Sequence, residues 1–256
     1  MKSKAEIVAD WLPRYTGLPL KDFGQCILLT NFHQYLRIFA EKNDVPIVGT
    51  DRPMPCASAR DITMINFSMG SANAATVMDL VSAVSPKAVL FLGKTGSLKQ
   101  EIALGELILP IAAIRGEGTS NDYFPPEVPA LPAFALQKAV SLTITEHERD
   151  YWTGVVYTTN RRVWEHDDQF RDHLQRIRCT AIDMETATIF IVGFHNHIPT
   201  GALLMVSDHP MIPEGIKTSE SDARISQRFI EDQIDIGTES LRHIIERRQA
   251  VKHLHF

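Results

Sequence analysis

Residues 62–92 read ITMINFSMGSANAATVMDLVSAVSPKAVLFL. The apolar residues 62–67 predict a buried strand, and the small residues that follow open a helix expected to continue to about Val84. Residues 87–92 predict a second buried strand, which we expect to end at Gly93. A strand, a helix and a strand in this order are typical of a sheet that is covered by helices.

The rest of the chain repeats this alternation. Short apolar runs predict strands at residues 26–30, 106–111, 154–157 and 202–206. Helices are expected at residues 34–42 and 184–194, from about Ala133, and over residues 221–248, where Ile230, Ile234, Leu241 and Ile245 form one apolar stripe. We therefore expect an α/β fold with a mostly parallel or mixed sheet. No repeat or linker divides the sequence, so we expect one domain over residues 1–256.

The composition is that of an ordinary globular protein. The chain has 256 residues, 44% of them hydrophobic, and a formal net charge of −5. These values exclude disordered and collagen-like classes. The mild acidity argues against nucleic acid as the main partner, because proteins that follow phosphates usually carry a basic face. The sequence has neither a signal-peptide core nor an apolar run long enough for a bilayer, so we expect a cytoplasmic protein that is not membrane-bound.

Two glycine-containing segments are candidates for binding an anion. Residues 67–74 (FSMGSANA) and 92–98 (LGKTGSL) each follow a predicted strand, where ligands bind in open α/β sheets. Small residues let backbone N–H groups approach a phosphate, although either segment alone could be a plain turn. The second lacks the earlier glycine of a P-loop, since Ala88 stands there, and the chain has no GxGxxG motif.

Two acidic motifs could carry chemistry. Asp183-Met184-Glu185 precedes a predicted helix, and Ser207-Asp208 ends a predicted strand. A carboxyl group in such a place, inside a cleft, can have a raised pKa and act as a general acid. The competing interpretation is that Asp183 or Glu185 caps the helix and that Asp208 starts a turn.

Other signals are weaker. Trp164 could stack on a base or fill the core, and Arg161 and Arg162 are interpreted as solvated charges. The cysteines Cys26, Cys56 and Cys179 lie far apart, which predicts neither a disulfide framework nor a CxxC metal site. The His residues match no zinc pattern, so no metal is expected.

Taken in order, the segments SMGSANA, LGKTGSL, AIDMETATI and LLMVSD resemble the nucleoside phosphorylase/nucleosidase superfamily. Within it, YTTNRRVWEHDDQF, CTAIDMETATIF and PTGALLMVSDHP look most like AMP nucleosidases. The resemblance covers roughly residues 26–242. It implies a three-layer α/β/α sandwich with a mixed, partly barrel-like sheet, and homo-oligomers, with hexamers favoured. Long bacterial members carry an additional N-terminal regulatory domain, for which this chain is too short, so a catalytic-domain-only form is expected.

The resemblance also implies residue roles. Asp208 matches the carboxyl group that donates a proton to purine N7, with Ser207 supporting it. Glu185 matches the carboxylate that holds the ribose hydroxyls, with Met184 against the sugar. The remaining substrate contacts that it implies are Trp164 and Tyr157 at the base, Gly70, Ser71, Lys94 and Thr95 near an anion, and Arg52, which would reach a neighbour's site.

One departure from the superfamily bears on the reaction. Its phosphorylases have a Gly and an Arg for free phosphate after the first strand, and an Arg just before the second glycine segment. Here residues 30–35 read TNFHQY, and Phe91-Leu92 stand at the second place. This implies water as the nucleophile and a phosphate carried on the substrate, which means hydrolysis of AMP to adenine and ribose 5-phosphate without a cofactor. Asn31 and His33 are both candidates for positioning the water.

Two alternatives stay open at this point. One is a nucleosidase or phosphorylase that acts on unphosphorylated nucleosides. The other is a non-catalytic nucleotide-binding protein on the same fold.

Overall fold

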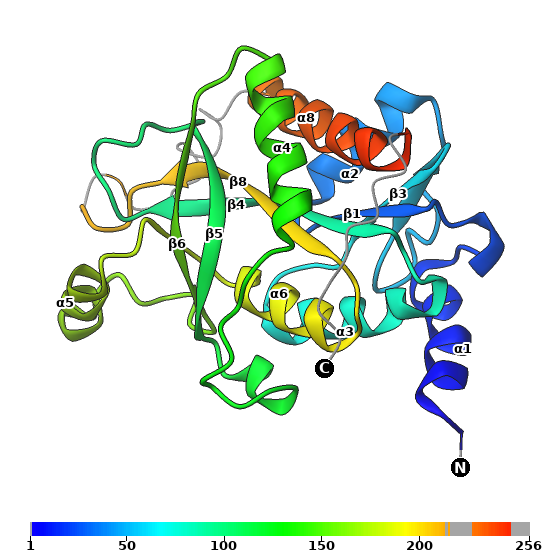
Figure 1. The fold of residues 1–256 in the computed structure, drawn as a ribbon, viewed down its shortest axis with the longest axis horizontal. Coiled ribbons are helices and arrows are strands. Elements are labelled where there is room, and N and C mark those ends of the chain that lie inside the picture. The colour runs from blue at the N-terminus through cyan, green and yellow to red at the C-terminus, as the bar shows by residue number, and fades with distance from the viewer. Residues whose placement is uncertain (1, 213–214, 216–226, 247–256) are drawn as a thin grey trace.

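The computed structural model describes residues 2–212, 215 and 227–246, and its strands form one mixed sheet (Figure 1). The sheet order is β2-β3-β1-β4-β7-β6-β5-β8, and β4 pairs with β8 as well. The strands are β1 Cys26–Thr30, β2 Cys56–Ala59, β3 Ile62–Asn66, β4 Ala88–Ser97, β5 Leu107–Gly116, β6 Tyr151–Thr159, β7 Ala181–Asp183 and β8 Thr200–Asp208.

Strand β4 belongs to two parts of the sheet. On one edge it pairs in parallel with β1, which extends the open half of the sheet to β3 and β2. On its other edge it pairs in parallel with β8 over residues 89–96. Past the end of β1, the first edge of β4 pairs antiparallel with β7 through Gly96 and Ser97. Because β8 pairs in turn with β5, the strands from β4 to β8 close into a barrel. The expected mixed and partly barrel-like sheet is confirmed.

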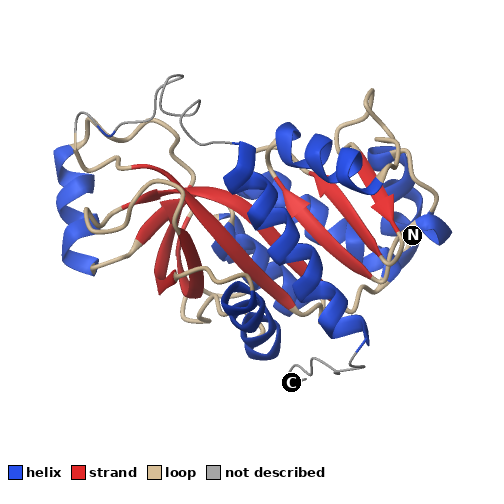
Figure 2. Ribbon diagram, turned by 90° about the horizontal axis from the view of Figure 1, so that it is seen from above, coloured by secondary structure: helices blue, strands red, loops and turns tan. Residues whose placement is uncertain are grey.

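Helices cover both faces of the sheet, as Figures 1 and 2 show. One layer holds α2 (His33–Asn43), α4 (Phe134–Glu146) and α8 (Gln227–Glu246), and the other holds α1 (Lys4–Thr16), α3 (Ser71–Leu80) and α6 (Thr186–His195). Helix α5 (Asp168–Ile177) packs beside the barrel. The expected three-layer arrangement is confirmed. Within the described residues, no helix is both long and apolar enough to cross a membrane.

The two faces of the sheet enclose separate cores because side chains alternate along each strand. In β1, Ile27 and Leu29 pack in the core under α1, α3 and α6, whereas Cys26 and Leu28 pack under α2, α4 and α8. All four side chains are fully buried. Strands buried on both faces read as continuous apolar runs, which is why the sequence reveals them so clearly.

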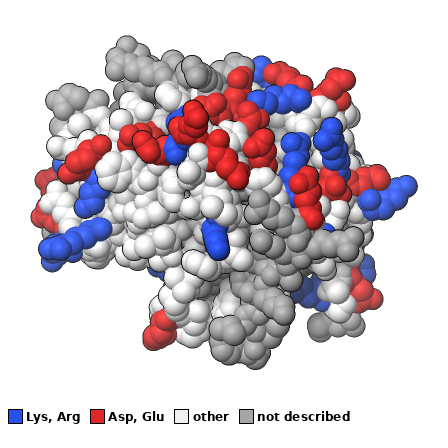
Figure 3. Space-filling view, turned by 45° about the horizontal axis from the view of Figure 1, so that its top comes forward, with Lys and Arg blue, Asp and Glu red and all other residues white. Residues whose placement is uncertain are grey.

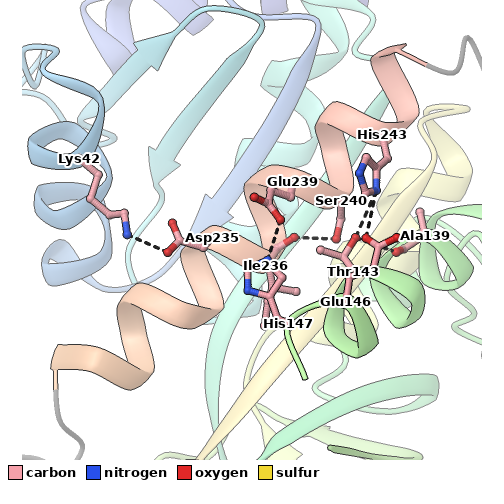
Figure 4. Close-up of polar contacts among 10 residues, drawn as sticks. All are labelled: Lys42, Ala139, Thr143, Glu146, His147, Asp235, Ile236, Glu239, Ser240 and His243. Carbon is pink, nitrogen blue, oxygen red and sulfur yellow. Dashed lines mark hydrogen bonds and ion pairs between the residues drawn. The ribbon is translucent and has the colours of Figure 1, made fainter. Parts of the chain in front are cut away.

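Polar contacts fasten α8 to the helices beside it (Figure 4). The Lys42 ammonium group at the end of α2 lies 2.8 Å from Asp235, and His147 Nε2 lies 2.6 Å from Glu239 Oε2. The apolar side of α8 faces the sheet, and Ile230, Ile234 and Leu241 are buried there as the stripe predicts. Of the helix predicted over residues 221–248, residues 221–226 and 247–248 lie outside the described residues.

The structure corrects one expected boundary. The sequence predicts that a strand ends at Gly93, but β4 continues to Ser97. Residues 93–96 pair with β8, and the register shifts by one residue between Thr95 and Gly96, opposite Asp208. Closure of the barrel therefore extends the strand, and the segment is not a turn that opens a helix. The sequence analysis also missed α1, β2, α5 and β7; of these, β2 and β7 are short and α5 is mostly polar.

Candidate active site

A cavity of about 280 Å³ opens where strands β1, β4, β6, β7 and β8 end. Its walls come from segments that are far apart in the sequence. They are Asn31 and Phe32 after β1, Met69 before α3, Lys94, Thr95 and Gly96 in β4, Thr159, Arg161, Arg162, Trp164 and Glu165 after β6, Ile182, Asp183, Met184 and Glu185 around β7, and Ser207, Asp208 and Pro210 around β8. Strand ends in α/β sheets are common ligand sites, and this cavity approaches the size of a small-molecule pocket.

Glu185 is one of two buried carboxyl groups that line this cavity, with 2% of its surface exposed, and Asp183 is the other. The backbone N–H of Gly70, at the start of α3, donates to Glu185 Oε1 over 2.7 Å. The side chain of Asn31 also donates to this carboxylate. Burial and the neighbouring Asp183 raise the pKa of Glu185, and these hydrogen bonds only partly offset the rise.

Asp183 anchors the turn that carries Glu185. Its carboxylate accepts the backbone N–H of Thr186 over 2.8 Å and the hydroxyl of Thr158 over 2.7 Å. Burial raises the pKa of Asp183, against these hydrogen bonds. The interpretation of Asp183 as a helix cap is therefore confirmed, whereas Glu185 makes no side-chain cap and faces the cavity.

Asp208 enters the cavity at the end of β8. The Ser207 hydroxyl donates to Asp208 Oδ1 and also lies 3.4 Å from the carbonyl oxygen of Thr95. Gly96 makes room for the Asp208 carboxyl group, since a Cβ atom at Gly96 would lie 3.2 Å from Asp208 Oδ2 and 2.9 Å from Pro210 Cγ. A short polar pair and a glycine thus hold this carboxyl at the cavity wall.

Lys94 and Thr95 line the same cavity from β4. The Lys94 ammonium group lies 4.9 Å from the centre of the Phe32 ring, a cation–π contact. The Thr95 hydroxyl donates to the carbonyl oxygen of Ile182 over 2.7 Å. The hydroxyl hydrogen of Thr95 is therefore used within the sheet. Lys94 is the cation that β4 brings to the cavity.

Eight of the residues that the sequence analysis selected meet in this cavity. They are Asn31, Lys94, Thr95, Trp164, Met184, Glu185, Ser207 and Asp208. Four others do not line it in this single chain. Gly70 lies behind Glu185, Ser71 Oγ is 2.9 Å from Thr119 Oγ1, Tyr157 packs edge-on against Phe170, and Arg52 lies beside Asp51 in an exposed loop.

The cavity also contains residues that the sequence analysis missed or read differently. Arg161 and Arg162 line it, and both side chains are also exposed, as their interpretation as solvated charges predicts. Arg161 pairs with Asp167 at 2.8 Å, and Arg162 lies 3.4 Å from Glu165. Two arginines directly after a strand end, next to Trp164, were the available signal. Within the described residues, no cluster of His, Cys, Asp or Glu side chains could hold a metal ion.

Comparison with known proteins gives consistent matches. The model of the phosphorylase superfamily matches residues 36–246. The crystal structure of AMP nucleosidase from Bacteroides thetaiotaomicron VPI-5482 is 55% identical, with a TM-score of 0.86 over 96% of this chain and 100% of that one. Uridine phosphorylase from Vibrio fischeri ES114, 20% identical with a TM-score of 0.77, covers 87% of this chain and 94% of its own and shares the fold.

A curated relative is longer than this chain. AMP nucleosidase from Escherichia coli strain K12 is 28% identical over 279 residues, which cover 90% of this chain and 57% of the relative. The chain thus spans little more than half the length of the curated AMP nucleosidases that it matches.

Proposed function

The chain belongs to the phosphorylase superfamily, and we propose that it hydrolyses the N-glycosidic bond of AMP to adenine and ribose 5-phosphate. The observation that carries this proposal is one cavity that holds Asp208, Glu185 and Lys94. The 55% identity to an AMP nucleosidase over nearly the whole chain supports the same substrate.

Each of these groups has a task in that reaction. When the glycosidic bond breaks, the sugar becomes positive and adenine must not leave as an anion. In our proposal, Asp208 donates a proton to N7 of the purine, as a general acid does. Glu185 accepts hydrogen bonds from the ribose hydroxyls. These hydrogen bonds favour the charged carboxylate, which stabilises the positive sugar beside it. Lys94 binds the 5′-phosphate, and Trp164 packs against the base.

Two features support hydrolysis over phosphorolysis. The Gly and Arg that bind free phosphate in related phosphorylases have no counterpart in residues 30–35. At the second arginine position, Phe91 is fully buried against Phe67, with the ring centres 5.8 Å apart. This side chain belongs to the core and brings no charge to the cavity. We therefore assign water as the nucleophile, with no metal or cofactor.

We extend the proposal to the setting of the enzyme. In this proposal it is a cytoplasmic catalytic domain over residues 1–256 that forms homo-oligomers, with hexamers favoured, in which Arg52 reaches a neighbour's site. Exposed apolar side chains such as Phe134 and Ile111, 82% and 57% exposed, support a contact between copies. Nucleic acid is not a proposed partner, and on the face drawn in Figure 3 the Lys and Arg side chains are mixed with Asp and Glu and form no continuous basic patch.

The test is an assay of purified protein with AMP, with and without inorganic phosphate. We expect adenine and ribose 5-phosphate, formed at a rate that does not depend on phosphate. An absolute phosphate requirement, with ribose 1,5-bisphosphate as product, would contradict hydrolysis. Faster cleavage of adenosine than of AMP would favour a nucleosidase for unphosphorylated substrates, and binding of AMP without adenine release would favour a non-catalytic protein.

A further inference from the structure

The amide nitrogen of Asn31 donates a hydrogen bond, whereas the amide oxygen has no hydrogen-bond partner among the described residues. Asn31 directly follows β1 and lines the cavity. Its side chain donates a hydrogen bond to Glu185. Its oxygen, Oδ1, is buried and has no hydrogen-bond partner among the residues that the structure describes. Buried acceptors of this kind are rare in folded proteins and call for a functional explanation.

The orientation of this amide follows from chemistry. An Asn side chain has a donor end and an acceptor end, and the donor end must face the Glu185 carboxylate. The reversed orientation would set two oxygens against each other. Oδ1 is therefore committed to the side of the amide away from Glu185, where it can accept one hydrogen bond or two.

The place of Asn31 in the sheet decides what it can meet. Strand β1 lies along one edge of β4, and β8, which carries Asp208, lies along the other. In the proposed reaction, Asp208 marks the side on which adenine leaves. The nucleophile must approach the anomeric carbon from the opposite side, and Asn31 is the residue after β1 that offers an acceptor there. Its neighbour Phe32 has no acceptor, the Met69 sulfur is only a weak one, and Lys94 only donates.

We infer that Asn31 Oδ1 accepts a hydrogen bond from the attacking water and directs the water's lone pair at the anomeric carbon. This inference rests on the proposed hydrolysis of AMP. The sequence analysis named both Asn31 and His33 as candidates for positioning the water. The inference favours Asn31, because His33 is the exposed first residue of α2 and does not line the cavity.

The step balances without a further reactant. The C1′–N9 bond breaks, and its electron pair leaves with adenine, which takes a proton at N7 from Asp208. The water oxygen forms the new bond to C1′. The water then releases one proton to solvent, which replaces the proton that Asp208 gave. Asn31 orients the water and is neither protonated nor deprotonated.

The experiment compares Asn31→Ala and Asn31→Ser with the wild-type chain, using AMP and dAMP as substrates. Asn31→Ala should lower kcat for AMP about 10- to 100-fold, change KM less than about threefold, and leave the AMP-to-dAMP ratio of kcat/KM unchanged. Asn31→Ser keeps a hydroxyl that can donate to Glu185 and accept from the water, and it should recover at least a third of the wild-type kcat. Asn43→Ala, the same substitution at the other end of α2, is the matched control and should behave as wild type.

Three outcomes would overturn the inference. Unchanged kcat in Asn31→Ala would remove the water contact, and a raised KM with normal kcat would make Asn31 a substrate-binding group. A smaller AMP-to-dAMP ratio of kcat/KM in Asn31→Ala would mean that Oδ1 binds the 2′-hydroxyl of the substrate. If thermal melting shows that Asn31→Ala is unfolded, Asn31→Leu, which keeps the size of the side chain and lacks the acceptor, decides by the same criteria. Failure of the wild type to release adenine from AMP would instead defeat the proposed function itself.

Discussion

The backbone N–H of Gly70 donates to the Glu185 carboxylate over 2.7 Å and joins two turns that lie 115 residues apart in the sequence. Gly70 is the N-cap of α3, so the contact brings the positive end of a helix to a buried carboxylate. Its backbone has φ +100° and ψ 153°, a conformation open almost only to glycine. The position of Glu185 thus depends on a residue that does not line the cavity.

Gly70→Ala should therefore reduce both stability and activity. A Cβ atom at Gly70 would meet nothing within 4 Å, so the cost comes from the backbone alone, about 1–3 kcal/mol. Relief of that strain moves the N–H away from Glu185, and we expect kcat/KM for AMP to fall about tenfold. Gly118→Ala is the control, since Gly118 also has positive φ and open space, and it should lower the melting temperature without changing kcat/KM.

Asp208→Asn should keep the shape of the cavity but remove the transferable proton. We expect AMP turnover to fall by about two orders of magnitude or more, while calorimetric titration still detects AMP binding. Asp168→Asn, at an exposed position on α5, serves as the control. Turnover of Asp208→Asn within a few-fold of wild type would exclude Asp208 as the proton donor.

Substrate choice should depend on Lys94 and Glu185 separately. Hydrogen bonds to a charged group contribute ~1.5–3 kcal/mol, so loss of the 2′-hydroxyl in dAMP should lower kcat/KM about 10- to 100-fold. Lys94→Ala should reduce the difference in kcat/KM between AMP and adenosine. Glu185→Gln should reduce the difference in kcat/KM between AMP and dAMP. Kinetics of the three substrates with both variants test this, and an adenosine rate equal to the AMP rate in the wild type would contradict a phosphate contact at Lys94.

Asp79 should contribute to stability at neutral pH and not in acid. Burial opposes its charge, but hydrogen bonds from Lys4, Asn196 and Tyr123 outweigh burial and hold the pKa of Asp79 below its usual value. A lowered folded-state pKa stabilises the protein above the unfolded pKa of about 4, and this contribution is lost as the pH falls through the folded value.

The measurement is urea unfolding of wild type and Asp79→Asn between pH 7 and pH 3. The difference in unfolding free energy should be largest near neutrality and should shrink below about pH 4. Asp10→Asn, which removes an exposed carboxylate 3.6 Å from Arg14, should show little difference at any pH. A constant difference for Asp79→Asn across the range would mean that its charge has no part in stability.

The sequence was informative where local pattern and order suffice. The apolar runs predicted β1, β3 and β8, and the order of the motifs predicted that Glu185 and Asp208 share a site with Lys94. The extension of β4 to Ser97 was not predictable, because it depends on pairing with β8 about 110 residues later.

The direction of single side chains was the other limit. Tyr157 lies in a predicted strand and was expected to contact the base, yet its ring packs against Phe170 of α5. The pairing of β5 with β6 skips Ile111, an extra residue in β5, so alternation in one strand does not predict which residues of the other share its face. Arg161 reaches the cavity wall beside Phe170, with its guanidinium 5.3 Å from that ring, a contact set by how α5 packs.

The double pairing of β4 has a consequence for the order in which the chain is synthesised. Once residue 97 has left the ribosome, the open half of the sheet, β2-β3-β1-β4, is available for pairing. The second edge of β4 has no complete partner until residues 200–208 emerge. A growing chain must therefore shield an apolar strand edge for about a hundred residues, a state that invites aggregation and chaperone binding. Asp208 is the last residue of β8, the strand that covers this edge. The cavity therefore lacks its proposed proton donor until the barrel can close.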